Sequence, residues 1–218
     1  MTYIPQATSQ AARRVGRPVG ASATRERLLE VAEGLFSERG LAGTTVRDVA
    51  EQLGVSGAAL LHHFGTKETL YAEVLERVAA SLQAYAPPPG TSADTAKLNS
   101  IFERHLDWTL AHPNYSRLIM RELLENRSRA GRAHRWYLKP VMGAYIDAIE
   151  RGQTDSKLPA FDAEIFAYLV TGAIAHFAAA AFSVTQLHGL RREAEALERF
   201  RSLLPALPFP ACSAPPPP

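Results

Sequence analysis

The fold is decided by residues 44–64, TTVRDVAEQLGVSGAALLHHF, which predict two short helices joined by a tight turn. Thr45 with Asp48 three positions later has the spacing of a helix-capping box, in which each side chain accepts a hydrogen bond from the other residue's backbone N–H. Gly54 can supply the turn, and Ser56 can cap the second helix.

This pair of helices meets the packing demands of a helix-turn-helix unit. Such a unit needs a small residue where the helices meet, a glycine at the turn, and an apolar residue that fastens the second helix. Ala50, Gly54 and Leu60 occupy these places, and the apolar residues that complete the small core are Val49, Leu53 and Val55. A second helix held in this way can enter the major groove of DNA. The pattern alone also fits a generic helical hairpin.

Helical periodicity continues on both sides. One helix is predicted from Ser22 or Thr24 to the stop at Gly40, and a longer one from Thr66 to about Tyr85. Pro87-Pro88-Pro89-Gly90 ends the longer helix and marks an internal boundary. Further helices are predicted near 98–111 (ended by His112-Pro113), 114–127, 133–153 (kinked at Pro140), 163–187 and 190–204. We therefore predict an all-α fold.

The chain divides into four predicted parts. They are a flexible basic arm at 1–21, a three-helix head with the helix-turn-helix at 22–68, a helical effector-binding and dimerisation bundle at 69–204, and a proline-rich disordered tail at 205–218.

Composition narrows the class of protein. Apolar residues make up 46% of the chain, enough for a packed core, and charged residues 21%. No continuous apolar run reaches the ~18 residues of a membrane span, and no apolar stretch follows the N-terminal arginines as in a secretory signal. The single cysteine, Cys212, excludes an internal disulfide and a multi-cysteine metal site. We expect a cytoplasmic protein without a cofactor.

Several stretches together resemble one known family. They are Thr24–Leu28, Phe36–Gly40, Thr44–Ala50 and Leu53–Ser56, with Leu60, His62, Phe64, Lys67, Glu68 and Leu70. Over residues 22–75 the chain is similar to the DNA-binding domain of the tetracycline-repressor (TetR) family. The resemblance implies a homodimeric transcription regulator with an effector cavity in its C-terminal helices.

The recognition helix that this resemblance implies, Ser56–Phe64, departs from the usual pattern. The family commonly has lysine or glutamine, then glycine or proline, then threonine or serine, where this chain has Gly57, Ala58 and Ala59. The family's phosphate-contacting tyrosine is replaced by Leu61, and a second aromatic residue is replaced by His63. We therefore expect DNA reading to shift to Arg47, which can pair with a guanine or hold a phosphate, and to His62 and His63.

Two further DNA contacts are predicted outside that helix. Lys67 matches the family's lysine at the start of the fourth helix, where a phosphate would also meet helix amides. Gly16-Arg17-Pro18 resembles the core of an AT-hook, so Arg17 either enters a minor groove or belongs to a simple basic tail. The full predicted DNA-contacting set is Arg17, Thr45, Arg47, Ser56, Gly57, Ala58, Ala59, Leu61, His62, His63 and Lys67.

Polar and aromatic residues on the apolar C-terminal helices are candidates for a ligand cavity, with plain core packing as the alternative for each. They are Phe102, His105, Trp108, Tyr115, Ile119, Trp136, Tyr137, Val141, Tyr145, Tyr168 and His176. The histidines lack a tight metal-ligand spacing, so no metal site is predicted.

The small residues of 163–187, among them Gly172 and Ala173, allow helices to approach closely. With the last helix, this segment is the candidate for the four-helix dimer interface that the family resemblance implies, and an internal core helix is the alternative. The expected mechanism is a repressor on a palindromic operator that is released by a small, largely apolar ligand, with Thr66–Tyr85 as the lever. The alternative is a constitutive architectural DNA-binding protein. An enzyme is not expected, because no nucleophile–base pair, phosphate loop or metal cluster is visible.

Overall fold

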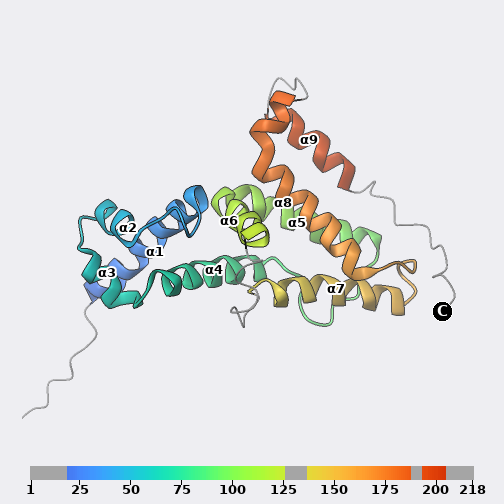
Figure 1. The fold of residues 1–218 in the computed structure, drawn as a ribbon. Helices are drawn as coiled ribbons and strands as arrows, with labels where there is room; N and C mark the ends of the chain where they lie inside the picture. The colour runs from blue at the N-terminus through green and yellow to red at the C-terminus, as the bar shows by residue number, and fades with distance from the viewer. Residues whose placement is uncertain (1–18, 126–136, 188–192, 205–218) are drawn as a thin grey trace, which may run out of the picture.

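The computed structural model describes residues 19–125, 137–187 and 193–204, and the regular structure in these residues is entirely α-helical, which confirms the predicted fold class. The helices are α1 (Val19–Arg39), α2 (Val46–Gln52), α3 (Gly57–Phe64), α4 (Lys67–Gln83), α5 (Thr95–Ala111), α6 (Pro113–Glu125), α7 (Lys139–Thr154), α8 (Ala163–Leu187) and α9 (Glu193–Leu203). Helices α1–α3 form a head at one end, and α4 leads from it into a body made of α5–α9 (Figure 1).

The local signals of the helix-turn-helix act as predicted. Thr45 Oγ1 accepts from the Asp48 backbone N at 3.1 Å, and Asp48 Oδ2 accepts from the Thr45 backbone N at 2.8 Å, so the capping box is complete. Gly54 adopts a φ of 65°, a left-handed conformation that costs other residues free energy. Ser56 Oγ then accepts from the Ala59 backbone N at 3.1 Å and caps α3.

The head is held by apolar side chains from each of its helices. Phe36 of α1, Ala50 of α2 and Leu60 of α3 are almost wholly buried, and Leu53 and Val55 pack against the same core. Complete burial of one leucine stabilises a fold by roughly 1.5–3 kcal/mol, so Leu60 fastens α3 firmly. The small side chain of Ala50 lets α2 and α3 approach each other.

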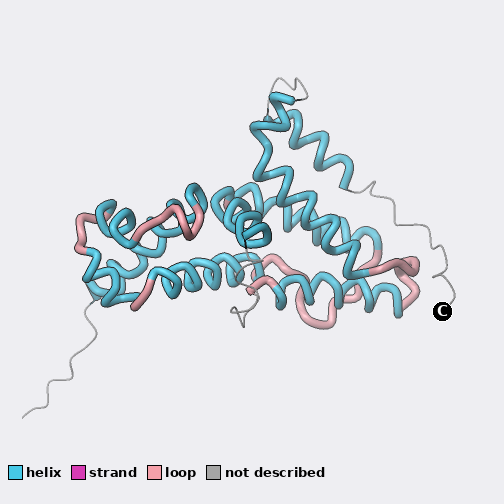
Figure 2. The backbone as a smooth tube through the Cα atoms, in the orientation of Figure 1, coloured by secondary structure: helices cyan, strands magenta, loops and turns pink. Residues whose placement is uncertain are grey.

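Helix α4 belongs to both head and body. Its predicted apolar face is buried throughout, and comprises Leu70, Tyr71, Val74, Leu75, Val78 and Leu82. The same hydrophobic core runs on into α5, α7 and α8, so no break separates head and body at the proline-rich loop after α4. Figure 2 shows this connection from α4 to α5 as a loop.

The starts of α7 and α1 differ from prediction. The predicted kink at Pro140 is wrong, because α7 begins at Lys139 and Pro140 lies in its first turn. A proline fits there because the first turn needs no intrahelical N–H donor. Helix α1 begins at Val19, inside the predicted arm, whereas the predicted start of the last helix at 190 lies outside the described residues. The arm residue Arg17, the pocket candidate Trp136 and the tail lie outside the described residues.

Candidate nucleic-acid interface and ligand core

One side of α3 is clamped to the head and the other is open. Leu60 and Phe64 are buried, whereas Ala58, Ala59 and Leu61 are exposed. The open side therefore presents mainly methyl and methylene groups to any partner. His62, also exposed, is the polar group that stands beside them.

The other predicted contacts of the helix-turn-helix divide by what their side chains already do. The hydroxyls of Thr45 and Ser56 are occupied as helix caps. Gly57 and His63 are half-buried. Arg47 is the most available, since its side chain is 85% exposed and its Nε donates to Glu51 Oε1 at 2.6 Å on the same helix. This hydrogen bond raises the pKa of the Arg47 guanidinium, so the side chain is fully charged.

The Lys67 side chain forms hydrogen bonds within the head. Its ammonium donates to the backbone oxygens of Leu41 at 2.8 Å and Thr44 at 3.0 Å, which ties the first residue of α4 to the loop between α1 and α2. A phosphate contact by Lys67 stays a prediction, and in the free protein the charge stabilises the fold around the helix-turn-helix.

Sequence reasoning missed a second fastening of the head. Arg25 of α1 forms an ion pair with Glu73 of α4, and its guanidinium lies 4.8 Å from the ring centre of Phe64 in α3. A cation over an aromatic face is attracted by the ring's electrons. Arg25 thus joins three helices, and no local signal could show this because its partners are far away in the sequence.

The structure gathers most predicted cavity residues in the body. Phe102, His105 and Trp108 of α5 are buried together with Tyr115 of α6 and Tyr145 of α7. Val141 is buried close by, and Ile119 and Tyr137 are partly buried against the same core. The rings of Phe102 and Tyr145 stack with centres 5.9 Å apart. These side chains pack against each other and form one buried, largely aromatic cluster.

Two predicted cavity residues are not brought to this cluster. Tyr168 and His176 lie on an exposed side of α8, where 51% of Tyr168 is accessible. The prediction failed for these two residues because α8 is apolar around most of its circumference. Its sequence therefore does not distinguish the buried side of the helix from the outer side.

The outer surface of α8 is unusually apolar. Ile165 and Leu169 are 64% and 63% exposed, and Leu203 of α9 adds to them. Beside them lies an apolar hollow of about 120 Å³, lined by Leu169, Val170, Ala173, Phe200, Leu203 and Leu204. Residues Ala163–Ala180 are long and apolar enough to cross a membrane by length and composition, but 44% of this stretch is buried inside the structure. A core helix with one uncovered apolar side gives the same signal.

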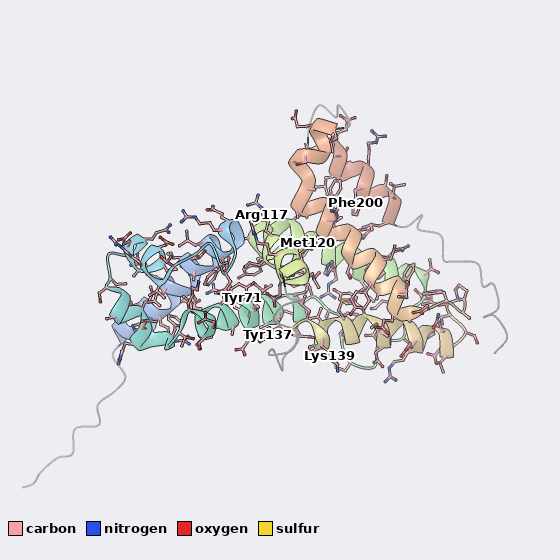
Figure 3. The ribbon with its side chains drawn as sticks, viewed as in Figure 1. Tyr71, Arg117, Met120, Tyr137, Lys139 and Phe200 are labelled. Atoms are coloured by element: carbon pink, nitrogen blue, oxygen red, sulfur yellow. The ribbon has the colours of Figure 1, made fainter. Side chains whose placement is uncertain are left out.

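Helix α6 joins the body to the head through polar contacts. Arg121 donates to the backbone oxygens of Ser37 at 3.1 Å and Glu38 at 2.7 Å, in the last turn of α1. Tyr71 of α4 donates to Glu122 of α6 at 2.9 Å, where α4 passes beneath α6 (Figure 3). The charge of Arg121 is favourable at the carboxyl end of α1 because the helix dipole is negative there.

The same junction contains a half-buried charge cluster. Arg77 Nε of α4 lies 3.8 Å from Glu33 Oε2 of α1, and Tyr115 of α6 lies close enough to this pair to affect the pKa of both groups. Burial raises the pKa of Glu33 despite these partners. Any movement of α6 must therefore disturb contacts with both α1 and α4.

Comparison with known proteins supports the interpretation of the head. The family model of bacterial regulatory proteins of the tetR family matches residues 28–74. The HTH-type transcriptional repressor KstR2 of Rhodococcus jostii is 48% identical over 56 residues, which are 26% of this chain and 28% of that protein. The chain thus matches little more than a quarter of the length of this relative.

Longer matches are weaker. The HTH-type transcriptional repressor Rv3405c of Mycobacterium tuberculosis is 28% identical over 165 residues, covering 76% of this chain and 73% of that protein. The solved structure of the ketosteroid transcriptional regulator KstR2 of Mycobacterium tuberculosis superposes with a TM-score of 0.59 at 19% identity, covering 84% of this chain and 93% of the other. At that identity the likeness shows the fold alone.

Proposed function

Because this chain belongs to the TetR family of bacterial regulatory proteins, we propose that it is a homodimeric transcriptional repressor that releases its operator DNA when a small, largely apolar ligand binds its C-terminal helices. The observation that carries this proposal is the geometry of α3, which is clamped by Leu60 and Phe64 and open on the opposite side. The relatives are transcriptional regulators rather than enzymes. The protein would act in the cytoplasm, where its DNA lies.

The open side of α3 suggests how DNA would be read. Ala58, Ala59 and Leu61 have no hydrogen-bonding side-chain atoms, so they would contact thymine methyl groups in the major groove. Arg47, which is exposed and charged, would add a guanine or a phosphate contact. Most of the remaining affinity would come from contacts to the sugar-phosphate backbone of the DNA, as is usual for protein–DNA complexes.

The uncovered surface of α8 supports the homodimer. A second copy that packs its own α8 and α9 on this surface would remove Leu169, Ile165 and Leu203 from water. The apolar hollow between α8 and α9 would take one side chain from the partner. A two-fold arrangement is the usual outcome for such a self-complementary patch.

Release would pass through the junction at α6. Ligand entry among the packed aromatic side chains of α5 and α7 would displace α6, whose Arg121 holds the last turn of α1. Because α4 contacts the same junction through Tyr71, the angle between head and body would change with it. A ligand shifts this equilibrium only by its difference in affinity for the two states.

The packed core favours one alternative, a constitutive DNA-binding protein without an effector. Trp108 and Tyr145 are almost wholly buried, and their rings lie against those of Tyr115 and Phe102. A metabolite screen on the DNA-bound protein separates the two functions, since release by any compound supports the repressor and indifference to all of them supports the alternative.

The direct test is enrichment from a random DNA pool by the purified full chain. We expect a specific sequence to emerge, and Leu61→Glu, which places a carboxylate on an exposed position of α3, to abolish its binding without lowering the melting temperature. Leu124→Glu on the exposed end of α6 is a matched control that should bind normally. Failure to enrich any sequence contradicts the proposal.

A further inference from the structure

His105 differs from every other buried polar side chain in the described part of the chain. The other five are hydroxyls, and each donates to a backbone carbonyl; they are Ser37, Thr44, Thr109, Ser116 and Thr171. His105 is 5% exposed and pairs instead with another side chain, its Nδ1 lying 2.9 Å from Tyr145 Oη.

The hydrogen bonds of this pair do not balance. Burial lowers the pKa of His105 to about 4, so at neutral pH the ring is uncharged, with one N–H donor and one lone-pair nitrogen. Tyr145 adds one donor and one acceptor, and the bond between the two residues uses one of each. Whichever residue donates, one donor and one acceptor remain, and within the described residues neither has a partner.

The surroundings of the pair are aromatic. The ring of Phe102 is stacked on Tyr145, and Phe166 lies against Phe102 with ring centres 6.1 Å apart. Trp108 lies 6.2 Å from His105, and its own N–H is already taken by Ser81 Oγ at 2.9 Å. A buried donor or acceptor without a partner is unfavourable, so this arrangement favours a ligand that pairs with it.

We propose that His105 and Tyr145 bind the oxygen of an uncharged ligand, a hydroxyl or a carbonyl group carried on an apolar body. The inference rests on the proposed function, in which the C-terminal helices hold the effector. A hydroxyl oxygen can use both the free donor and the free acceptor, and a carbonyl uses the donor. An uncharged ligand is favoured over a carboxylate or an amine, because a charged group would lose its hydration among the same buried aromatic side chains that lower the pKa of His105.

This position also connects to the head. Trp108 lies 5.9 Å from Tyr115 by ring centres, and Tyr115 lies beside the ion pair that Glu33 of α1 forms with Arg77 of α4. A ligand that displaces Trp108 would therefore reach the junction of α1, α4 and α6 through one intervening side chain.

The test uses four probes that share one bicyclic body: 1-indanol, 1-indanone, indane and indane-1-carboxylate. Binding to the full chain is followed by the ¹⁵N signals of the His105 ring and by titration calorimetry. We expect 1-indanol and 1-indanone to shift these signals saturably and to bind about 3- to 10-fold more tightly than indane, as one net hydrogen bond implies. Equal binding of the alcohol and indane, tighter binding of the carboxylate, or no shift with any probe overturns the inference.

Variants of Tyr145 and His105 separate recognition from folding. Tyr145→Phe keeps the ring that packs on Phe102 and should abolish the preference for the alcohol over indane, while Tyr85→Phe at an exposed position should retain it. Should Tyr145→Phe melt below the assay temperature, His105→Gln, whose amide offers both N–H donors and a carbonyl acceptor, should retain a measurable preference that His105→Leu loses. DNA enrichment by the same protein is measured separately, so a protein that binds DNA but ignores neutral oxygen ligands refutes this inference and leaves the proposed function standing.

Discussion

Replacing Lys67 with methionine tests whether its charge supports the fold or contacts DNA. The ammonium donates to Leu41 O at 2.8 Å and Thr44 O at 3.0 Å, and Thr44 is itself fully buried. Methionine keeps much of the length and apolar stem of lysine but has no donor. Both carbonyls would then lose their partner, and the start of α4 would lose its tie to the loop that precedes α2.

The magnitude follows from these two bonds. A hydrogen bond to a charged group contributes about 1.5–3 kcal/mol when buried. The Lys67 side chain is only half-buried and water can replace part of each bond, so we expect a total loss of about 1–2 kcal/mol in the free energy of unfolding. For a chain of this size such a loss lowers the melting temperature by about 2–8 °C.

The assay is urea and thermal unfolding of Lys67→Met without DNA, followed by its affinity for an enriched DNA sequence. Lys97→Met, at an exposed position of α5, is the matched control and should unfold like the parent protein. An unfolding free energy equal to that of the parent, together with weaker DNA binding, would refute the structural role and restore the phosphate contact that the sequence predicts.

Four further predictions follow from other parts of the molecule. Leu169→Asp, on the 63% exposed position of α8, should convert a dimer into a monomer in sedimentation equilibrium, whereas Leu124→Asp should leave the dimer intact. Arg121→Ala should accelerate amide hydrogen exchange in the last turn of α1, and unchanged exchange would show that α6 does not hold it. Hydrogen bonds from Thr45 lower the pKa of the Asp48 carboxyl. The carboxylate therefore stabilises the folded head above the ordinary aspartate pKa of about 3.9, and this stabilisation is lost as the pH falls through the lowered pKa. Asp48→Asn should destabilise the head at pH 7 but have little effect at pH 2.5. Replacing one thymine that faces α3 with uracil should weaken binding about fourfold, the effect of one buried methyl group, and unaltered affinity would exclude methyl reading.

Local sequence signals were sufficient to predict the helix-turn-helix. The capping box of Thr45 and Asp48, the turn at Gly54 and the cap at Ser56 each involve residues at most three positions apart, and the structure confirms them. The all-α class and the buried face of α4 were predictable for a related reason, since an amphipathic period is visible in one helix at a time.

Interactions between distant residues were not predictable. Lys67 finds its carbonyl partners 23 and 26 positions earlier, and His105 lies 40 positions from Tyr145. The start of α7 was misplaced because Pro140 is compatible both with a kink and with a first turn, and only the packed structure decides between them.

The most direct measurement of the central claim is a hydroxyl-radical footprint of the full chain on its enriched DNA. A two-fold dimer that places one α3 in each of two successive major grooves predicts two related half-sites with centres roughly 34–36 Å apart, protected together on one face of the duplex. A single unrepeated protected site, or uniform protection without preferred positions, would contradict a homodimeric operator-binding repressor.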